Sequence, residues 1–165
     1  MSVPTSVPDS ETRLTADDHQ ALRLWLRLMA CTTVIETEVR QGLAREFGTT
    51  LPRFDFLSQL DRVPEGLRMG ELSQRMMVTG GNVTGIAAAL ESEGLIDRQP
   101  DPKDRRIYRV RLTNAGRRSF RRMAAAHEGW IVDLLAGLED GQQAQLCEIL
   151  AGLKKHVLAR VQAEE

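Results

Sequence analysis

The sequence predicts a mainly α-helical fold that carries one small β-hairpin. Hydrophobic residues make up 42% of the 165 residues but aromatic residues only 4%, so the core consists mostly of Leu, Ala, Met and Val. This composition is typical of helices packed on helices. One stretch differs, because residues 95–98 and 107–112 alternate apolar and polar side chains as half-buried strands do. The residues between them, 100–104, are rich in Pro and Asp and suit an exposed turn.

Two helices are expected before the hairpin region. The first runs from residue 16 to about residue 47, with Thr15 as its N-cap and Asp18 as the partner in a capping box. It contains no proline, and Gly48 ends it. The second begins near Pro52, because proline is favoured just inside a helix start, and it ends at residues 64–66.

The next two helices are short and close together. Residues 69–76 read as a helix, residues 78–81 as a glycine-containing turn, and residues 82–93 as a second helix with apolar side chains at helical spacing. Two such helices form a helix-turn-helix unit. After the hairpin, Thr113 caps a helix that reaches about residue 137, and a last helix covers about residues 140–162.

The charge of the chain is concentrated in one region. Residues 98–122 contain ten Arg or Lys and two Asp, a local charge of +8 in a chain whose net charge is -1. Such a basic hairpin indicates a polyanionic partner, and nucleic acid is the first choice. The overall pI of about 6.3 does not add to this argument. The alternative interpretation is a solvated hairpin whose charges only keep it soluble.

Several function classes lack support. No apolar run is long enough to span a membrane, and the first fifteen residues do not resemble a signal peptide. Two isolated cysteines and no export signal favour the cytoplasm. The sequence has no nucleophile motif, phosphate-binding loop, dinucleotide-binding turn or metal-ligand spacing, so we expect neither an enzyme nor a cofactor.

A family resemblance rests on the turn and its neighbours. Residues 101–106 read D-P-K-D-R-R, residues 110–116 read V-R-L-T-N-A-G, and three upstream segments match in order and spacing: 71–73, 82–84 and 90–96. Over residues 18–161 the chain resembles the multiple-antibiotic-resistance regulator (MarR) family. The resemblance implies a winged helix-turn-helix repressor, an obligate homodimer in which the N- and C-terminal helices of both chains interlock.

The resemblance also implies a division of the chain. Residues 1–14 are expected to be a disordered arm, because they are rich in Pro and Ser. Residues 15–48 and 114–165 are expected to form the helical dimerisation region. Residues 49–113 are expected to form the winged helix-turn-helix lobe that binds DNA at a pseudo-palindromic operator.

The DNA-binding residues follow from charge and from the resemblance. The resemblance places Arg106 in the minor groove, where negative potential attracts arginine. Asp104 is expected to orient an arginine of the wing through a bidentate pair. No Lys or Arg lies within residues 80–93, so base reading falls to uncharged side chains. The predicted set is Thr79, Asn82, Thr84, Arg98, Lys103, Arg105, Arg106 and Arg109.

A narrower resemblance concerns the effector. Residues 51–57, L-P-R-F-D-F-L, and residues 81–85, G-N-V-T-G, resemble regulators of aromatic-acid and hydroxycinnamate catabolism, some of which answer to aryl-CoA thioesters. The expected effector is therefore an aromatic acid or its CoA thioester. Candidate ligand contacts are three large side chains and three groups able to meet a carboxylate, and each is alternatively a core or surface residue: Trp25, Phe54, Trp130, His19, Arg40 and Arg53.

Two other functions stay open at this point. The uncharged recognition helix fits a helical dimer that senses or interacts without sequence-specific DNA binding. A thiol-based redox sensor would use Cys31 or Cys147, but such a thiol needs a lowered pKa and access to solvent. Cys31 has no adjacent basic residue, so a buried and inert cysteine is expected there.

Overall fold

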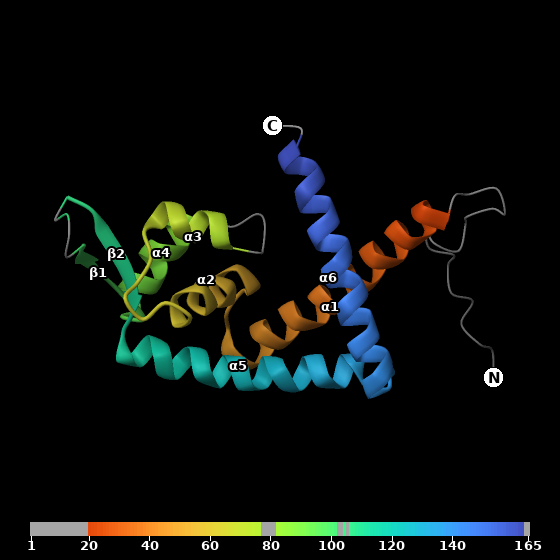
Figure 1. The fold of residues 1–165 in the computed structure, drawn as a ribbon. Helices are drawn as coiled ribbons and strands as arrows, with labels where there is room; N and C mark the ends of the chain where they lie inside the picture. The colour runs from red at the N-terminus through yellow and green to blue at the C-terminus, as the bar shows by residue number, and fades with distance from the viewer. Residues whose placement is uncertain (1–19, 77–81, 102–103, 105, 164–165) are drawn as a thin grey trace. The chain divides into compact units, whose positions relative to one another are not determined.

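The computed structural model describes residues 20–76, 82–101, 104 and 106–163 (Figure 1). Five predicted features lie outside these residues: the disordered arm with the Thr15 cap, His19, the glycine-containing turn with Thr79, and the side chains of Lys103 and Arg105. The chain divides into two compact units, residues 1–130 and residues 131–165.

The fold consists of six helices and one two-stranded sheet within the described residues. This confirms the prediction of a mainly helical chain with a small hairpin. The elements, in chain order, are α1 Gln20–Phe47, α2 Leu51–Asp61, α3 Met69–Arg75, α4 Val83–Ser92, β1 Ile96–Pro100, β2 Tyr108–Leu112, α5 Asn114–Leu135 and α6 Asp140–Ala163.

The hairpin, called the wing from here on, is displaced slightly from its predicted position. β1 pairs with β2 in antiparallel register, from Ile96 opposite Leu112 to Pro100 opposite Tyr108. The first strand thus ends at Pro100, which the sequence placed in the turn. Both strands of a two-stranded sheet are edge strands, and proline is tolerated there because it need not donate to a neighbour.

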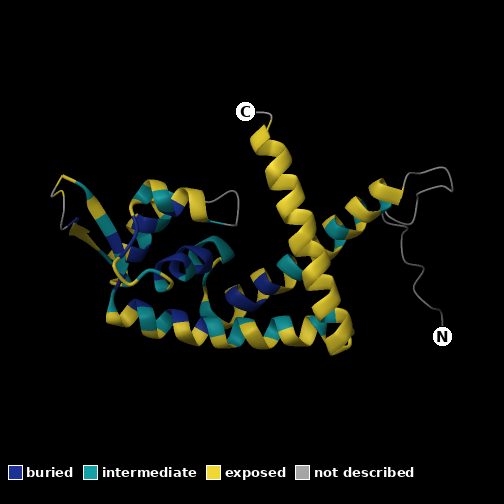
Figure 2. Cartoon of the chain, in the orientation of Figure 1, coloured by how far each residue is buried: buried dark blue, intermediate teal, exposed yellow. Residues whose placement is uncertain are grey.

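Helix α2 forms the centre of the core in the first unit (Figure 2). Phe56, Leu57 and Leu60 are at most 1% exposed, and α2 contacts α1, α3, α4 and β2. Pro52 occupies the first turn of α2, as predicted. Leu43 and Leu72 complete a core in which leucine predominates. The helix-turn-helix and the wing therefore share one hydrophobic core.

The wing joins α5 through a close backbone contact. The Thr113 hydroxyl accepts a hydrogen bond from the Gly116 amide at 3.0 Å, which confirms the predicted cap, and donates one to the Gly94 carbonyl at 2.7 Å. The Thr113 amide donates to the Leu95 carbonyl at 3.0 Å. Gly116 packs so tightly on Leu95 that a Cβ at this position would lie 1.9 Å from the carbonyl oxygen.

Large apolar side chains are exposed on two helices. No described residue of α6 is buried. This helix exposes seven large apolar side chains: Leu146, Ile149, Leu150, Leu153, Val157, Leu158 and Val161. Helix α1 exposes another set: Leu22, Leu24, Trp25, Met29 and Val34. Apolar surfaces of this extent mark interaction sites in soluble proteins.

The two cysteines lie on these same helices. Both Cys31 on α1 and Cys147 on α6 are exposed in the single chain. The expectation of a buried cysteine at position 31 is therefore wrong for the single chain. The buried residues of α1 lie near its C-terminal end, at Val39, Gly42 and Leu43, and Cys31 lies outside that part. None of the helices within the described ranges is long and apolar enough to cross a lipid bilayer.

Candidate nucleic-acid interface

Most basic side chains near the strands are paired within the chain. Arg98 on β1 places its Nε 3.0 Å from a carboxylate oxygen of Glu91. Arg111 on β2 donates to the carbonyl of Glu65 at 2.7 Å and to the side chain of Gln99 at 3.1 Å. Arg98 joins the wing to α4, and Arg111 joins it to the segment between α2 and α3. The charge available to a polyanion is therefore smaller than the residue count suggests.

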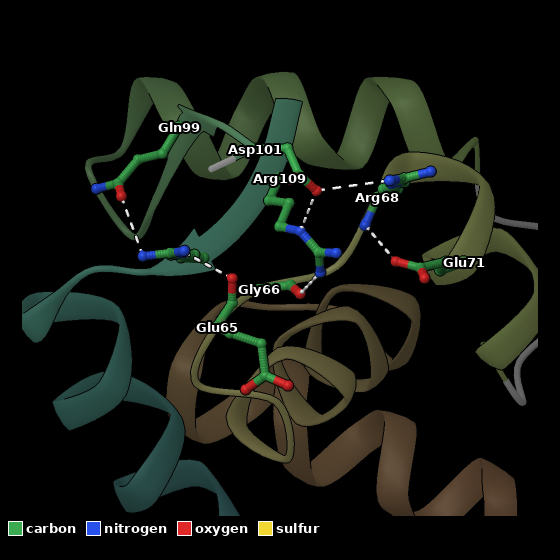
Figure 3. Close-up of polar contacts among 8 residues, drawn as sticks. Glu65, Gly66, Arg68, Glu71, Gln99, Asp101 and Arg109 are labelled. Atoms are coloured by element: carbon green, nitrogen blue, oxygen red, sulfur yellow. Dashed lines mark hydrogen bonds and ion pairs between the residues drawn. The ribbon is translucent and has the colours of Figure 1, made fainter. Parts of the chain in front are cut away.

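Arg109 is also held within the chain (Figure 3). Its Nε donates to the carboxylate of Asp101 at 2.6 Å, and another guanidinium nitrogen donates to the Gly66 carbonyl at 2.9 Å. The hydrogen bond to Asp101 is the main reason that the pKa of Arg109 is raised above its usual value. The structure thus places this predicted DNA-binding residue near the turn end of β2, where it contacts the segment before α3.

Within the described part of the wing, Arg106 at the tip is the arginine whose side chain is not bonded inside the chain. Arg106 is exposed, and its guanidinium has no ion-pair partner among the residues that the structure describes. Its backbone amide donates to the carboxylate of Asp104 at 3.0 Å, which tightens the turn. The described contacts of Asp104 are therefore with the backbone, while Asp101 holds an arginine side chain. Arg106 is positioned to meet an anion outside the molecule.

Helix α4 presents a small and uncharged surface. Ala87 and Leu90 are buried in the core, while Thr84, Gly85 and Ala88 are exposed. Asn82 caps the helix, and its Oδ1 accepts a hydrogen bond from the Gly85 amide at 3.1 Å. Bidentate pairing with adenine uses the same oxygen together with the amide group, so the helix cap and a base would share Oδ1 of Asn82. Thr79 lies outside the described residues.

The two glutamates near the end of α4 are both engaged. Glu91 pairs with Arg98, and Glu93 pairs with Arg53 at the start of α2. One arginine of α5 is paired as well, since Arg117 lies 3.4 Å from a carboxylate oxygen of Asp61. These internal pairs reduce negative potential beside α4, which favours the approach of DNA.

The predicted ligand residues do not form one cluster. Trp25 is 56% exposed, and Arg40 pairs with Glu36 within α1. Phe54 is buried with its ring centroid 5.5 Å from that of Phe120 on α5. Trp130 packs over Gly42 of α1. His19 lies outside the described residues.

Arg53 is the candidate ligand residue that lines a cavity. The cavity has a volume of about 360 Å³, and its wall includes Thr49, Arg53, Glu93, Ser119 and Arg122. The buried Nε of Arg53 has no hydrogen-bond partner among the described residues. The wall carries two guanidinium groups, of Arg53 and Arg122, and two carboxylates, of Glu46 and Glu93. An anion bound there by Arg53 would take the place of Glu93.

Comparison with known proteins decides the family. The MarR family profile matches residues 47–107, which run from the end of α1 to the turn of the wing. An HTH-type transcriptional regulator of Bacillus subtilis, YkoM, is 31% identical over 132 residues, which cover 78% of this chain and 83% of YkoM. The chain belongs to the MarR family.

Other comparisons place this MarR-family chain among transcriptional regulators rather than enzymes. BadR of Rhodopseudomonas palustris, a transcriptional activatory protein, is 32% identical over 99 residues, but the match spans only 56% of BadR and 59% of this chain. The structure of Sco3205 from Streptomyces coelicolor in complex with DNA is 28% identical, with a TM-score of 0.71, and the match covers 87% of this chain and 89% of Sco3205.

A further structure shares the fold alone. CouR from Rhodococcus jostii bound to p-coumaroyl-CoA is 23% identical, with a TM-score of 0.69, and the match covers 82% of this MarR-family chain and 95% of CouR.

Sequence reasoning did not single out Asp101, which the structure makes the central acid of the wing. The backbone amide of Asp101 donates to the Ile107 carbonyl at 2.7 Å, so Asp101 continues the strand register opposite Ile107. Arg109 is then its diagonal neighbour, a position within reach of a long side chain. The pairing would have been visible only with the strand register known, and the turn was predicted to start one residue too early.

Proposed function

We propose that this MarR-family regulator binds double-stranded DNA, with Arg106 of the wing in the minor groove and α4 at the major groove. The observation that carries the proposal is the unpaired, exposed Arg106 on a wing whose other described arginines are bonded within the chain. Arginine is attracted to narrow minor grooves by their negative potential. Sco3205, which is 28% identical, has been solved in complex with DNA, and this supports the proposed DNA binding.

The binding unit in this proposal is a homodimer. The apolar faces of α1 and α6 need a cover, and a second copy of the chain presents the same faces. Association through these helices places two winged lobes about a two-fold axis. Two-fold symmetry then requires a pseudo-palindromic operator with half-sites about one helical turn, roughly 10 base pairs, apart.

The proposed effector is an aromatic acid or its CoA thioester, and its binding releases the repressor from DNA. The cavity of about 360 Å³ falls within the range of small-ligand sites, about 300–1,000 Å³. The carboxylate of an aromatic acid, or a phosphate of its CoA thioester, would compete with Glu93 at the end of α4 for Arg53. Such a ligand lowers DNA affinity only by as much as it favours the conformation that does not bind DNA. CouR, a protein of the same fold, holds p-coumaroyl-CoA.

Fluorescence anisotropy with DNA from upstream of its own gene tests the proposed DNA binding. We expect two chains per duplex and an affinity that falls linearly on a plot of log K against log salt, because arginine displaces counterions from phosphates. About six phosphate contacts would cost on the order of a thousandfold in affinity between 50 and 200 mM salt. Equal affinity for random DNA would instead favour a helical dimer without sequence-specific binding.

A thermal-shift series tests the effector. Benzoate and 4-hydroxycinnamate are compared with the corresponding amides, which lack the carboxylate, and with their CoA thioesters, in which the phosphates of CoA are the anionic groups. We expect an acid or thioester present at 100 times its Kd to stabilise the folded chain by about 2.7 kcal/mol, and Arg53→Gln to reduce that gain. Arg40→Gln is the matched control, because Arg40 pairs with Glu36 away from the cavity. Equal ligand response in both variants would contradict the assignment of Arg53.

A further inference from the structure

The middle of β2 is bonded directly to the segment that leads into α3. The Leu67 amide donates to the Val110 carbonyl at 3.0 Å, and the Val110 amide donates to the Leu67 carbonyl at 2.8 Å. Gly66 has a positive φ of 85°, and a Cβ there would lie 2.6 Å from the Val110 carbonyl oxygen. Strand β2 and the start of the helix-turn-helix are therefore in backbone contact.

A buried carboxylate reinforces this contact. The side chain of Asp101 is 2% exposed, and one of its oxygens lies 2.6 Å from Arg109 Nε and 3.5 Å from the guanidinium of Arg68 (Figure 3). Arg109 also donates to Gly66, so a single guanidinium joins the end of β1, strand β2 and the segment before α3. A buried charge is tolerated only when it is paired and hydrogen-bonded in this way.

Arg68, the second arginine beside this carboxylate, is the N-cap residue of α3. The Arg68 amide donates to the side chain of Glu71 at 2.7 Å, which caps α3. Asp101 therefore contacts the residue at the start of α3 and a residue of β2 with the same oxygen. The turn that carries Arg106 lies between Asp101 and Arg109 in the sequence, so both ends of this turn are anchored at one point.

We propose that Asp101 is a positioning residue for DNA binding, whose buried carboxylate fixes the wing against α3 and so preorganises Arg106 for the minor groove. The inference rests on the proposed DNA binding and adds a residue that does not itself touch DNA. A wing without this anchor has more conformational entropy in the free protein. The loss of that entropy on binding reduces the affinity for DNA.

The direction in which Asp101→Asn changes the affinity for DNA distinguishes a positioning role from a purely electrostatic one. Asp101→Asn removes a negative charge from a DNA-binding surface, so electrostatics alone would tighten binding. Positioning has the opposite consequence, and we expect Asp101→Asn to bind operator DNA roughly tenfold more weakly. Asp97→Asn is the matched control, because it makes the same charge change on β1, where the Asp97 carboxylate accepts a hydrogen bond from the side chain of Gln99 at 3.0 Å. We expect its affinity to be equal or higher.

Hydroxyl-radical footprinting distinguishes positioning from a loss of stability. With Asp101→Asn we expect protection of the minor groove at the flanks of the operator to fade, while protection by α4 at the half-sites remains. Circular dichroism shows whether the variant is folded. Arg109→Lys is a second variant that keeps its charge but has no guanidinium to bridge Asp101 and Gly66, and it should give the same footprint.

The possible outcomes are distinct. If wild-type protein binds no DNA, the proposed function fails and the role of Asp101 fails with it. If wild-type protein binds and a folded Asp101→Asn binds as tightly or more tightly, only the role of Asp101 is overturned. Uniform loss of the whole footprint in both variants, in parallel with a lower Tm, would also overturn it, because Asp101 would then act through stability alone.

Discussion

Arg106→Ala is expected to weaken operator binding by roughly tenfold to a hundredfold for each wing, or about 1–3 kcal/mol. Arg106 is exposed at the wing tip and has no ion-pair partner among the described residues, so its charge is available to DNA. The neighbouring arginines on β2 are bonded inside the chain and cannot replace it without breaking those contacts. Anisotropy titrations at a single salt concentration measure the loss.

Arg45→Ala serves as the control for this variant. It removes the same charge from the exposed end of α1, where Arg45 lies 3.5 Å from Glu46, and the side chain is 67% exposed. Exposed pairs of this kind contribute at most about 1 kcal/mol. We expect DNA affinity to change little. Equal losses in the two variants would mean that net charge, rather than the wing tip, sets the affinity.

Gly116→Ala is expected to lower the free energy of unfolding by roughly 3 kcal/mol or more. A Cβ at this position would lie 1.9 Å from the oxygen and 2.8 Å from the carbon of the Leu95 carbonyl. These are backbone atoms, so relief requires a shift of α5 away from the wing. That shift also strains the Thr113 cap, which bonds the Gly116 amide. In a chain of this size the Tm should fall by roughly 6–12 °C.

Gly129→Ala is the matched control on the same helix. A Cβ at Gly129 meets no atom within 4 Å. Alanine is favoured over glycine within a helix, so this variant is expected to gain up to about 1 kcal/mol. Thermal and urea unfolding of both variants test the prediction. A Gly116→Ala variant as stable as wild type would show that the α5–wing contact is looser than the structure has it.

Local patterns in the sequence were sufficient for the elements. Apolar spacing, Pro52 at a helix start and Thr113 at a cap depend on residues within a few positions of one another, so helices α2 to α6 were predicted within a few residues of their bounds. The alternation that predicted the wing is equally local. Its first strand was assigned too short because the pairing of Pro100 with Tyr108 depends on the partner strand.

The candidate nucleic-acid interface could not be predicted in full from the sequence, because it depends on contacts between residues far apart in the chain. Charge counting identified the basic region but treated its arginines alike, whereas the structure pairs Arg109 with Gly66, 43 positions away, and Arg111 with Glu65, 46 positions away. The cavity beside Arg53 is likewise formed by α1, α2, α4 and α5 together.

The sequence by itself determined the helices, the wing and the basic turn, because each follows from residues close together in the chain. Only the tertiary structure decided which arginines are already paired and that buried Asp101 anchors the wing. The physical reason is that ion pairs and burial depend on separations set by packing. Those separations leave Arg106 as the described arginine of the wing that is free to meet an anion outside the chain.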